Sequence, residues 1–273
     1  MKTRRHIKRS IRTNFAERWT TFLDFPMYAA NSTGPSKFPR DLTLQGINDI
    51  VPRFADLAAL SSGQTVQHVN VESFIKDEAT RARSEILGNM LTEHGSEKAR
   101  KHNYHLLLAH ALQAPEKASA ILEIGMGTNN TDVVSHMGKR GQPGASLRAF
   151  REFLPNAHVY GADYDKRILF TEDRISTFFV DQTSVETLTD LATHLPAQLD
   201  LIIDDGLHSA HANLATLAFA LPKLAKGGWY ICEDIHAAAI PVWEAATHMI
   251  STDFTPYIVQ TAGAIVFAVH HKG

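Results

Sequence analysis

The chain contains one cysteine and no long apolar run. Because Cys232 is the single cysteine, no disulfide can form within the chain, and a zinc site built on several cysteines is excluded. No uninterrupted apolar stretch reaches the roughly 18 residues that a membrane-spanning helix needs, and the first residues lack the apolar segment of a signal peptide. These absences predict a cytoplasmic protein without a membrane span.

An excess of charge of one sign is also missing. The 27 lysine and arginine residues nearly balance the 29 aspartate and glutamate residues, so no overall field would draw the chain to nucleic acid or to an anionic membrane. We therefore expect no nucleic-acid partner, and any charged site must be local. With 44% hydrophobic residues in a length of 273, the chain can bury a full core.

Residues 1–94 are expected to form a helical region that serves as a lid, a substrate-binding element or an oligomerisation surface. Near its start, apolar residues recur every four positions among lysines and arginines: Ile7, Ile11, Phe15, Trp19 and Leu23. This pattern predicts a basic amphipathic helix. We favour a helix packed on the core or on a second subunit of a homo-oligomer; an anionic membrane surface, nucleic acid and a transit peptide are the alternatives.

The rest of this region is less regular. Residues 31–39 contain two prolines and a glycine and are expected to form a loop. Helices are then expected over residues 72–91 and 98–112, leading into the first strand. Residues 95–273 form the second predicted unit.

From about residue 118 onward, short β-rich runs alternate with helical stretches. This alternation predicts an α/β fold, a doubly wound Rossmann-like parallel sheet with helices on both faces. The expected strands cover residues 119–124, 158–162, 177–180, 199–203, 229–232, 254–260 and 264–270, and the expected helices cover 146–153, 184–194, 210–224 and 237–250. The last two strands flank a Thr261-Ala262-Gly263 turn, which predicts that the seven-stranded sheet ends in an antiparallel hairpin.

A glycine-rich turn follows the first of these strands, at Glu123-Ile124-Gly125-Met126-Gly127. Glycines there let the backbone approach a ligand where a Cβ would collide. Thr128-Asn129-Asn130 follows where a dinucleotide fingerprint needs its third glycine, so a nicotinamide cofactor is disfavoured.

Acidic residues follow the next two strands. Asp163 is placed to accept hydrogen bonds from ribose hydroxyls, but it lies 36 residues beyond Gly127 rather than the usual 20 or so. An inserted loop over residues 128–145 explains the excess if the first helix begins at Ser146 as its N-cap. Asp181-Gln182 follows the third strand, where adenine contact and helix capping are both open interpretations.

Two further pairs of carboxylates follow the fourth and fifth strands: Asp204-Asp205, with His208 shortly after, and Glu233-Asp234. The carboxyl ends of parallel strands meet at the edge where open α/β sheets bind ligands. Four acids crowded together repel one another unless a cation, a positive ligand or protonation relieves them. Mg²⁺ prefers hard oxygen ligands, so a bound Mg²⁺ would relieve this repulsion. The alternative is a structural role, in which Asp204 and Asp205 cap the following helix and Glu233 and Asp234 face solvent.

His208 stands out among the 15 histidines because it lies three positions after Asp205. That spacing lets one turn present a metal ligand and a base to the same substrate hydroxyl. A neutral imidazole titrates near neutral pH and can accept the proton. The pair Asp205 and His208 is therefore the predicted catalytic centre.

Taken together, these segments resemble the class I S-adenosylmethionine (SAM)-dependent methyltransferases, and within them the Mg-dependent sugar O-methyltransferases of macrolide biosynthesis. The match runs over about residues 95–235, through the glycine-rich turn, Gly144-Ala145-Ser146-Leu147-Arg148, Asp181-Gln182, the segment from Ile203 to His208, and Glu233-Asp234. Residues 1–90 and the inserted loop have no clear counterpart.

The resemblance implies a role for each site residue. Asp205, Glu233 and Asp234 would bind Mg²⁺, and His208 would be the general base. Residues 95–104 look like a segment that covers the cofactor, with Tyr104 lining its pocket. The residues expected around SAM are Tyr104, Glu123, Gly125, Gly127, Ser146, Asp163, Asp181, Gln182 and Asp204.

The predicted activity is therefore SAM-dependent O-methylation of a hydroxyl on a sugar or a glycosylated or polyol metabolite. Three alternatives remain. One is a metal-independent methyltransferase acting on nitrogen or a phenol. Another is a catalytically silent SAM-binding partner subunit, and the third is an NAD-type oxidoreductase, which lacks both the third glycine and a Tyr-x-x-x-Lys pair.

Overall fold

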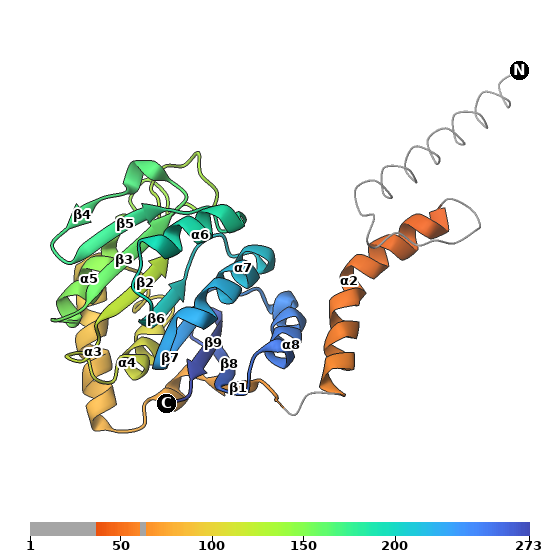
Figure 1. Cartoon of the computed structure of the whole chain (residues 1–273), viewed down its shortest axis with the longest axis horizontal. Coiled ribbons are helices and arrows are strands. Elements are labelled where there is room, and N and C mark those ends of the chain that lie inside the picture. The colour runs from red at the N-terminus through yellow and green to blue at the C-terminus, as the bar shows by residue number, and fades with distance from the viewer. Residues whose placement is uncertain (1–36, 61–63) are drawn as a thin grey trace, which may run out of the picture.

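The computed structural model describes residues 37–60 and 64–273. The predicted basic amphipathic helix over residues 2–23 lies outside the described residues. Helix α2 (Lys37–Ala59) begins within the stretch expected to be a loop, so that expectation fails for residues 37–39. Figure 1 shows α2 running beside α8 (Ile240–Met249), with which it is in contact.

The fold is organised around one nine-stranded sheet, in the order β1-β8-β9-β7-β6-β2-β3-β5-β4. The strands are β1 (Gln67–Asn70), β2 (Ala120–Ile124), β3 (His158–Asp163), β4 (Thr171–Glu172), β5 (Ile175–Phe179), β6 (Leu199–Asp204), β7 (Leu224–Cys232), β8 (Phe254–Gln260) and β9 (Ile265–His271). The five strands β7, β6, β2, β3 and β5 are mutually parallel, and β9 is antiparallel to both β7 and β8.

The seven predicted strands are all present, and the hairpin of β8 and β9 is confirmed. The sheet is wider than predicted because β1 adds to β8 in parallel and the two-residue β4 adds to β5. β1 is only four residues long and its side chains are mostly exposed, so it has no apolar run that would reveal it in the sequence.

Helices cover both faces of the sheet, as the doubly wound pattern requires. Successive residues of a strand point to opposite faces, so Ile121 joins one core and Leu122 the other. The first core is closed by α3 (Glu78–Glu93), α4 (Tyr104–Ala111) and α5 (Ala145–Phe153). The second core is closed by α6 (Val185–Thr193), α7 (Ala210–Ala220) and α8.

The division of the chain at residue 94 stays a prediction, and residues on both sides of it contribute strands to one sheet. β1 belongs to the common sheet, and α3 packs against α4 and α5. α3 starts six residues later than expected because Asp77 caps it, with its side chain accepting the N–H of Thr80 at 2.7 Å. α4 starts only at Tyr104, after Asn103 in the left-handed conformation.

No helix in residues 37–60 or 64–273 combines the length and the apolar character needed to cross a bilayer.

Candidate active site

The glycine-rich turn brings the backbones of β2 and β6 into close contact. The N–H of Asp205 donates to the carbonyl of Ile124 at 2.8 Å, and the N–H of Gly125 donates to Ala162 on β3 at 2.8 Å. A Cβ added at Gly125 would lie 2.2 Å from the carbonyl oxygen of Asp205. With φ values of +89° and +77°, Gly125 and Gly127 both adopt the conformation that favours glycine.

Two cavities meet at this turn. The first, of about 450 Å³, lies over the ends of β2, β3, β5 and β6; its lining includes Gly125, Gly127, Asp163, Asp181, Gln182 and Asp205. The second, of about 510 Å³, shares Gly125, Gly127 and Asp205 with it and is also lined by Lys98, Tyr104, Glu123, Ser146, His208 and Asp234. Together the two cavities border every predicted site residue except Asp204.

The inserted loop, predicted as residues 128–145, ends at Gly144 because α5 begins at Ala145, and it borders both cavities. Val134 and Ser135 border the first, and His136 and Met137 border the second. At the start of the loop the hydroxyl of Thr128 donates to Asp165, and Asn130 Nδ2 donates to the same carboxylate at 2.8 Å. At its end, Gly144 donates to the carbonyl of Met126 at 3.0 Å. An acid on the neighbouring strand end thus fixes the loop.

Asp163 lies at the end of β3, as predicted, and is buried beneath the glycine-rich turn. Its Oδ2 accepts the N–H of Met126 and its Oδ1 accepts the N–H of Asp165, both at 2.9 Å. Burial raises the pKa of Asp163, and these backbone donors oppose the shift. The carboxylate therefore helps to shape the turn while bordering the first cavity.

Asp181 and Gln182 border the first cavity, but their polar atoms are also used within the protein. Asp181 Oδ1 accepts the N–H of Thr183 at 2.9 Å, and the helix cap is Ser184 instead. The side-chain amide of Gln182 donates to Asp204 at 2.7 Å and accepts the N–H of Leu207 at 2.9 Å. Gln182 thereby joins the ends of β5 and β6.

Asp204 is set back from the ligand edge. It is fully buried, lines neither of the two cavities, and accepts hydrogen bonds from Gln182, Asn213 and the hydroxyl of Tyr230. Its position inside β6 points it into the second core, whereas Asp205 leaves the strand. Asp204 is thus held by protein partners behind the ligand edge, and its contact with the cofactor stays a prediction.

Ser146 and Glu123 are also engaged with each other. The Ser146 hydroxyl donates to Glu123 Oε2, and the N-cap of α5 is Gly144 rather than Ser146. Both residues border the second cavity, not the first.

A buried lysine sits among the clustered acids. Lys98 Nζ lies 2.6 Å from Asp205 Oδ2, 3.1 Å from Glu123 Oε1, and in contact with Glu233 Oε2. Burial lowers the pKa of Lys98, but the three carboxylates outweigh it and raise that pKa well above its ordinary value. Burial likewise raises the pKa of Glu123 and of Glu233, and the lysine opposes this. The positive charge of Lys98 therefore offsets part of the repulsion among the clustered carboxylates.

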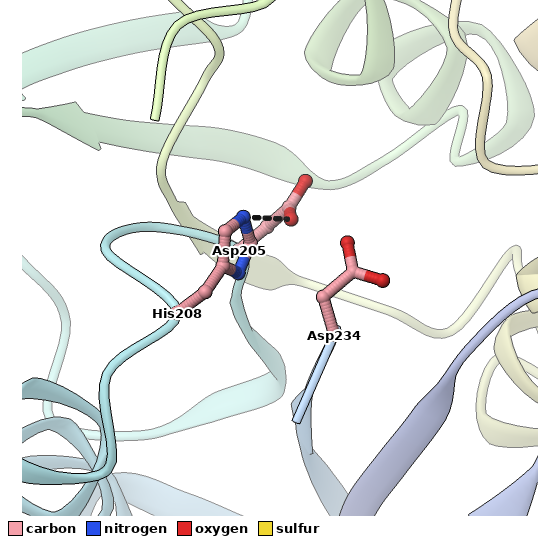
Figure 2. Close-up of side chains that lie close together, drawn as sticks. All are labelled: Asp205, His208 and Asp234. Carbon is pink, nitrogen blue, oxygen red and sulfur yellow. Dashed lines mark ion pairs between the residues drawn. The ribbon is translucent and has the colours of Figure 1, made fainter. Parts of the chain in front are cut away.

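Figure 2 shows the side chains of Asp205, His208 and Asp234 close together, with His208 paired to Asp205. His208 Nε2 lies 3.8 Å from Asp205 Oδ1, and ligand atoms of Asp205, His208 and Asp234 all lie within 4.8 Å of one another. His208 and Asp234 both have positive φ, 53° and 54°, a costly conformation for residues other than glycine. The hydroxyl of Tyr104 donates to Asp234 Oδ1 at 2.7 Å.

This donor set fits a hard divalent cation. Asp205 and Asp234 offer carboxylate oxygens, which Mg²⁺ prefers. Glu233 stands outside the three-residue group, but its Oε1 is buried and has no hydrogen-bond partner in the described part of the chain. An orphaned carboxylate oxygen beside the group is consistent with the predicted third acidic ligand.

The sequence did not single out Lys98 or Asp165. Lys98 lies in the segment recognised before the first strand, but nothing in its spacing from the acids shows that it reaches them. Asp165 follows Asp163 by two residues, so its position as a second acid just after a strand end could have drawn attention to it.

Comparisons with known proteins identify the family of the chain. The family model described as a methyltransferase domain matches residues 57–235. An 8-demethyl-8-alpha-L-rhamnosyl tetracenomycin-C 2'-O-methyltransferase from Streptomyces olivaceus is 30% identical over 162 residues, which are 59% of this chain and 40% of that protein. A mycinamicin VI 2''-O-methyltransferase from Micromonospora griseorubida is 35% identical over 99 residues, 36% of this chain and 24% of that protein.

Among solved structures, the MycE methyltransferase from the mycinamycin biosynthetic pathway, in complex with Mg and SAH, is 26% identical with a TM-score of 0.48. The match covers 57% of this chain and 41% of that one. The chain thus spans less than half the length of each of these three proteins. Because the family model covers well over half of the chain, the protein belongs to the methyltransferase-domain family.

Proposed function

We propose that the protein is a SAM-dependent O-methyltransferase that uses Mg²⁺ to methylate a hydroxyl of a sugar or glycosylated metabolite. The observation that carries this proposal is the meeting of two cavities at Gly125 and Asp205, with the group of Asp205, His208 and Asp234 in the second. One cavity can hold the nucleoside of a methyl donor and the other the acceptor. The relatives named as sugar O-methyltransferases support the same acceptor class.

The first cavity suits an adenosine. The carboxylate of Asp163 borders it at the end of β3, where ribose hydroxyls would be recognised, and Asp181 and Gln182 border it beyond β5, where the adenine would lie. The cavity extends past Gly125 and Gly127 to the second, so the methionine part of SAM would cross the turn. When bound, SAM supplies the methyl group as an electrophilic sulfonium.

The second cavity would hold the acceptor. Asp205 and Asp234, with Glu233 as the third carboxylate, would hold the cation, which when bound makes a nearby hydroxyl more acidic. His208 Nε2 is the imidazole nitrogen nearest to Asp205, so it is placed to take the hydroxyl proton. Positioning the two substrates on either side of one turn supplies much of the rate.

The experiment is a methyl-transfer assay with a panel of glycosides and nucleotide sugars, with release of S-adenosylhomocysteine (SAH) as the readout. We expect turnover that is lost in EDTA and restored by Mg²⁺. Turnover that resists EDTA would favour the metal-independent methyltransferase. Tight SAH binding with no turnover on any acceptor would favour the catalytically silent subunit.

Two lesser parts of the proposal concern the setting of the enzyme. A cytoplasmic location and a homo-oligomer are both proposed from the sequence. The acceptor is expected to be a small molecule, not a nucleic acid.

A further inference from the structure

Lys98 joins the ends of three adjacent strands. Its ammonium contacts Glu123 at the end of β2, Asp205 just after β6 and Glu233 just after β7, and these strands are neighbours in the sheet. Such carboxylates would otherwise repel one another. The lysine therefore fixes the mutual arrangement of three strand ends at the ligand edge.

The ammonium is engaged by all three carboxylates. It donates hydrogen bonds to Asp205 Oδ2 at 2.6 Å and to Glu233 Oε2, and it forms an ion pair with Glu123 Oε1 at 3.1 Å. The exposed fraction of the side chain is 7% for Lys98 and 1% for both Glu123 and Glu233. Lys98 is thus placed to act on the carboxylates at the wall of the second cavity.

The two oxygens of Asp205 have different partners. Oδ2 receives Lys98 Nζ at 2.6 Å, whereas Oδ1 lies 3.8 Å from His208 Nε2. A carboxylate held on one oxygen has a fixed orientation. The contact of Lys98 with Oδ2 therefore leaves Oδ1 facing His208 and Asp234. Asp205 is also the most exposed of the three lysine partners, at 25%.

The backbone holds Lys98 in place. Ser96 N–H donates to the carbonyl of Leu91 at the end of α3, and Tyr104 N–H donates to the carbonyl of Lys98 at 2.9 Å. The same short segment therefore presents Lys98 to Asp205 and the Tyr104 hydroxyl to Asp234.

We propose that Lys98 is a positioning residue that clamps Glu123, Asp205 and Glu233 together and so aims Asp205 Oδ1 at the cation site. This inference rests on the proposed function, because it concerns the same carboxylates. Partners that orient metal ligands typically change metal affinity by about 10- to 100-fold when removed.

The test measures Mn²⁺ binding by electron paramagnetic resonance, with Mn²⁺ as the probe. The key variant combines Lys98→Met with Glu123→Gln, which removes one charge of each sign and leaves the net charge of the cluster unchanged. We expect its Mn²⁺ affinity to fall by about 10-fold or more. Lys98→Arg, which keeps the charge and donors, should restore most of the affinity, and Lys117→Met, at an exposed lysine before β2, is the matched control.

The single variant Lys98→Met also separates positioning from charge. If the lysine acted by charge alone, removing its positive charge should tighten Mn²⁺ binding; if it positions Asp205, Mn²⁺ binding should weaken. Unchanged or tighter Mn²⁺ binding by the double variant, with folding verified by circular dichroism, would overturn the role of Lys98. A wild-type protein that binds SAH but no Mn²⁺ would instead overturn the metal site of the proposed function, and this inference with it.

Discussion

The backbone of Gly125 lies against the carbonyl of Asp205 so closely that a Cβ at position 125 would come within 2.2 Å of that oxygen. Gly125 belongs to the turn that borders both cavities, and Asp205 belongs to the group proposed to hold the cation. The close approach therefore links the cavity proposed for the methyl donor to the cavity proposed for the acceptor. The substitution Gly125→Ala, which adds one methyl group, tests this link.

Gly125→Ala is expected to lower the affinity for SAH by about 10-fold or more, because the added Cβ must push apart two backbones at a positive φ. Gly138→Ala is the matched control, since Gly138 also has a positive φ of 78° but, in the described chain, nothing beyond its two neighbouring residues lies within 4 Å of its added Cβ. The control should cost roughly 1–2 kcal/mol in the free energy of unfolding by urea and leave SAH binding unchanged. Equal losses of SAH affinity in the two variants would contradict the close-approach argument.

His208→Ala is expected to reduce kcat by about 100-fold or more while the dissociation constant of SAH stays within a factor of about three. The imidazole lies near Asp205 and borders the second cavity, which is proposed for the acceptor, so its loss should remove proton transfer and not donor binding. His211→Ala, at an exposed histidine in the first turn of α7, is the control. Near-normal turnover by His208→Ala would exclude the histidine as the base.

Tyr104→Phe is expected to raise the Mg²⁺ concentration that gives half-maximal activity by roughly 3- to 10-fold. The variant deletes only the hydroxyl that donates to Asp234 Oδ1 at 2.7 Å, and partners of metal ligands tune affinity without providing it. Asp234→Ala should abolish the Mg²⁺ dependence or the activity altogether. A Tyr104→Phe protein with an unchanged Mg²⁺ titration would show that this hydrogen bond does not orient Asp234.

Asp165 gives a pH-dependent prediction. The Arg167 side chain, with Thr128 and Asn130, holds the pKa of Asp165 well below its usual value of 3.8. A depressed carboxyl pKa contributes stability that is present above pH 3.8 and is lost as the pH falls from there toward the folded-state pKa. Asp165→Asn should therefore melt below the wild type at pH 7, and the gap should narrow below about pH 4. A gap that stays constant down to pH 3 would argue against an ionised Asp165 as the anchor of the loop.

Much of the fold follows from the sequence because it depends on local pattern. Strands buried on both faces, such as 120–124 and 199–204, read as apolar runs whatever lies beside them. β1 was missed because its side chains are mostly exposed and because its pairing with β8 joins residues 190 positions apart in the chain, such as Gln67 and Tyr257. The start of α4 was placed too early because Asn103 interrupts the helix with a left-handed residue.

The acidic residues of the candidate site could be predicted from the sequence, but the residues that contact them could not. Asp205, Glu233 and Asp234 follow strands, so parallel topology alone brings them to one edge. Whether a given acid faces a cavity or the core depends on whether it lies within the strand or after it. Asp204 is the last residue of β6 and is buried in the core. Lys98 comes from outside the strand pattern, so only the folded chain shows that it meets the acids.

The most direct test of the proposed function is isothermal titration calorimetry of the purified protein with SAM and SAH, with and without Mg²⁺, and with NADH as the control ligand. We predict SAH binding with a dissociation constant on the order of micromolar and no detectable binding of NADH. No binding of SAM or SAH, or tight binding of NADH, would contradict the assignment of the first cavity to the methyl donor.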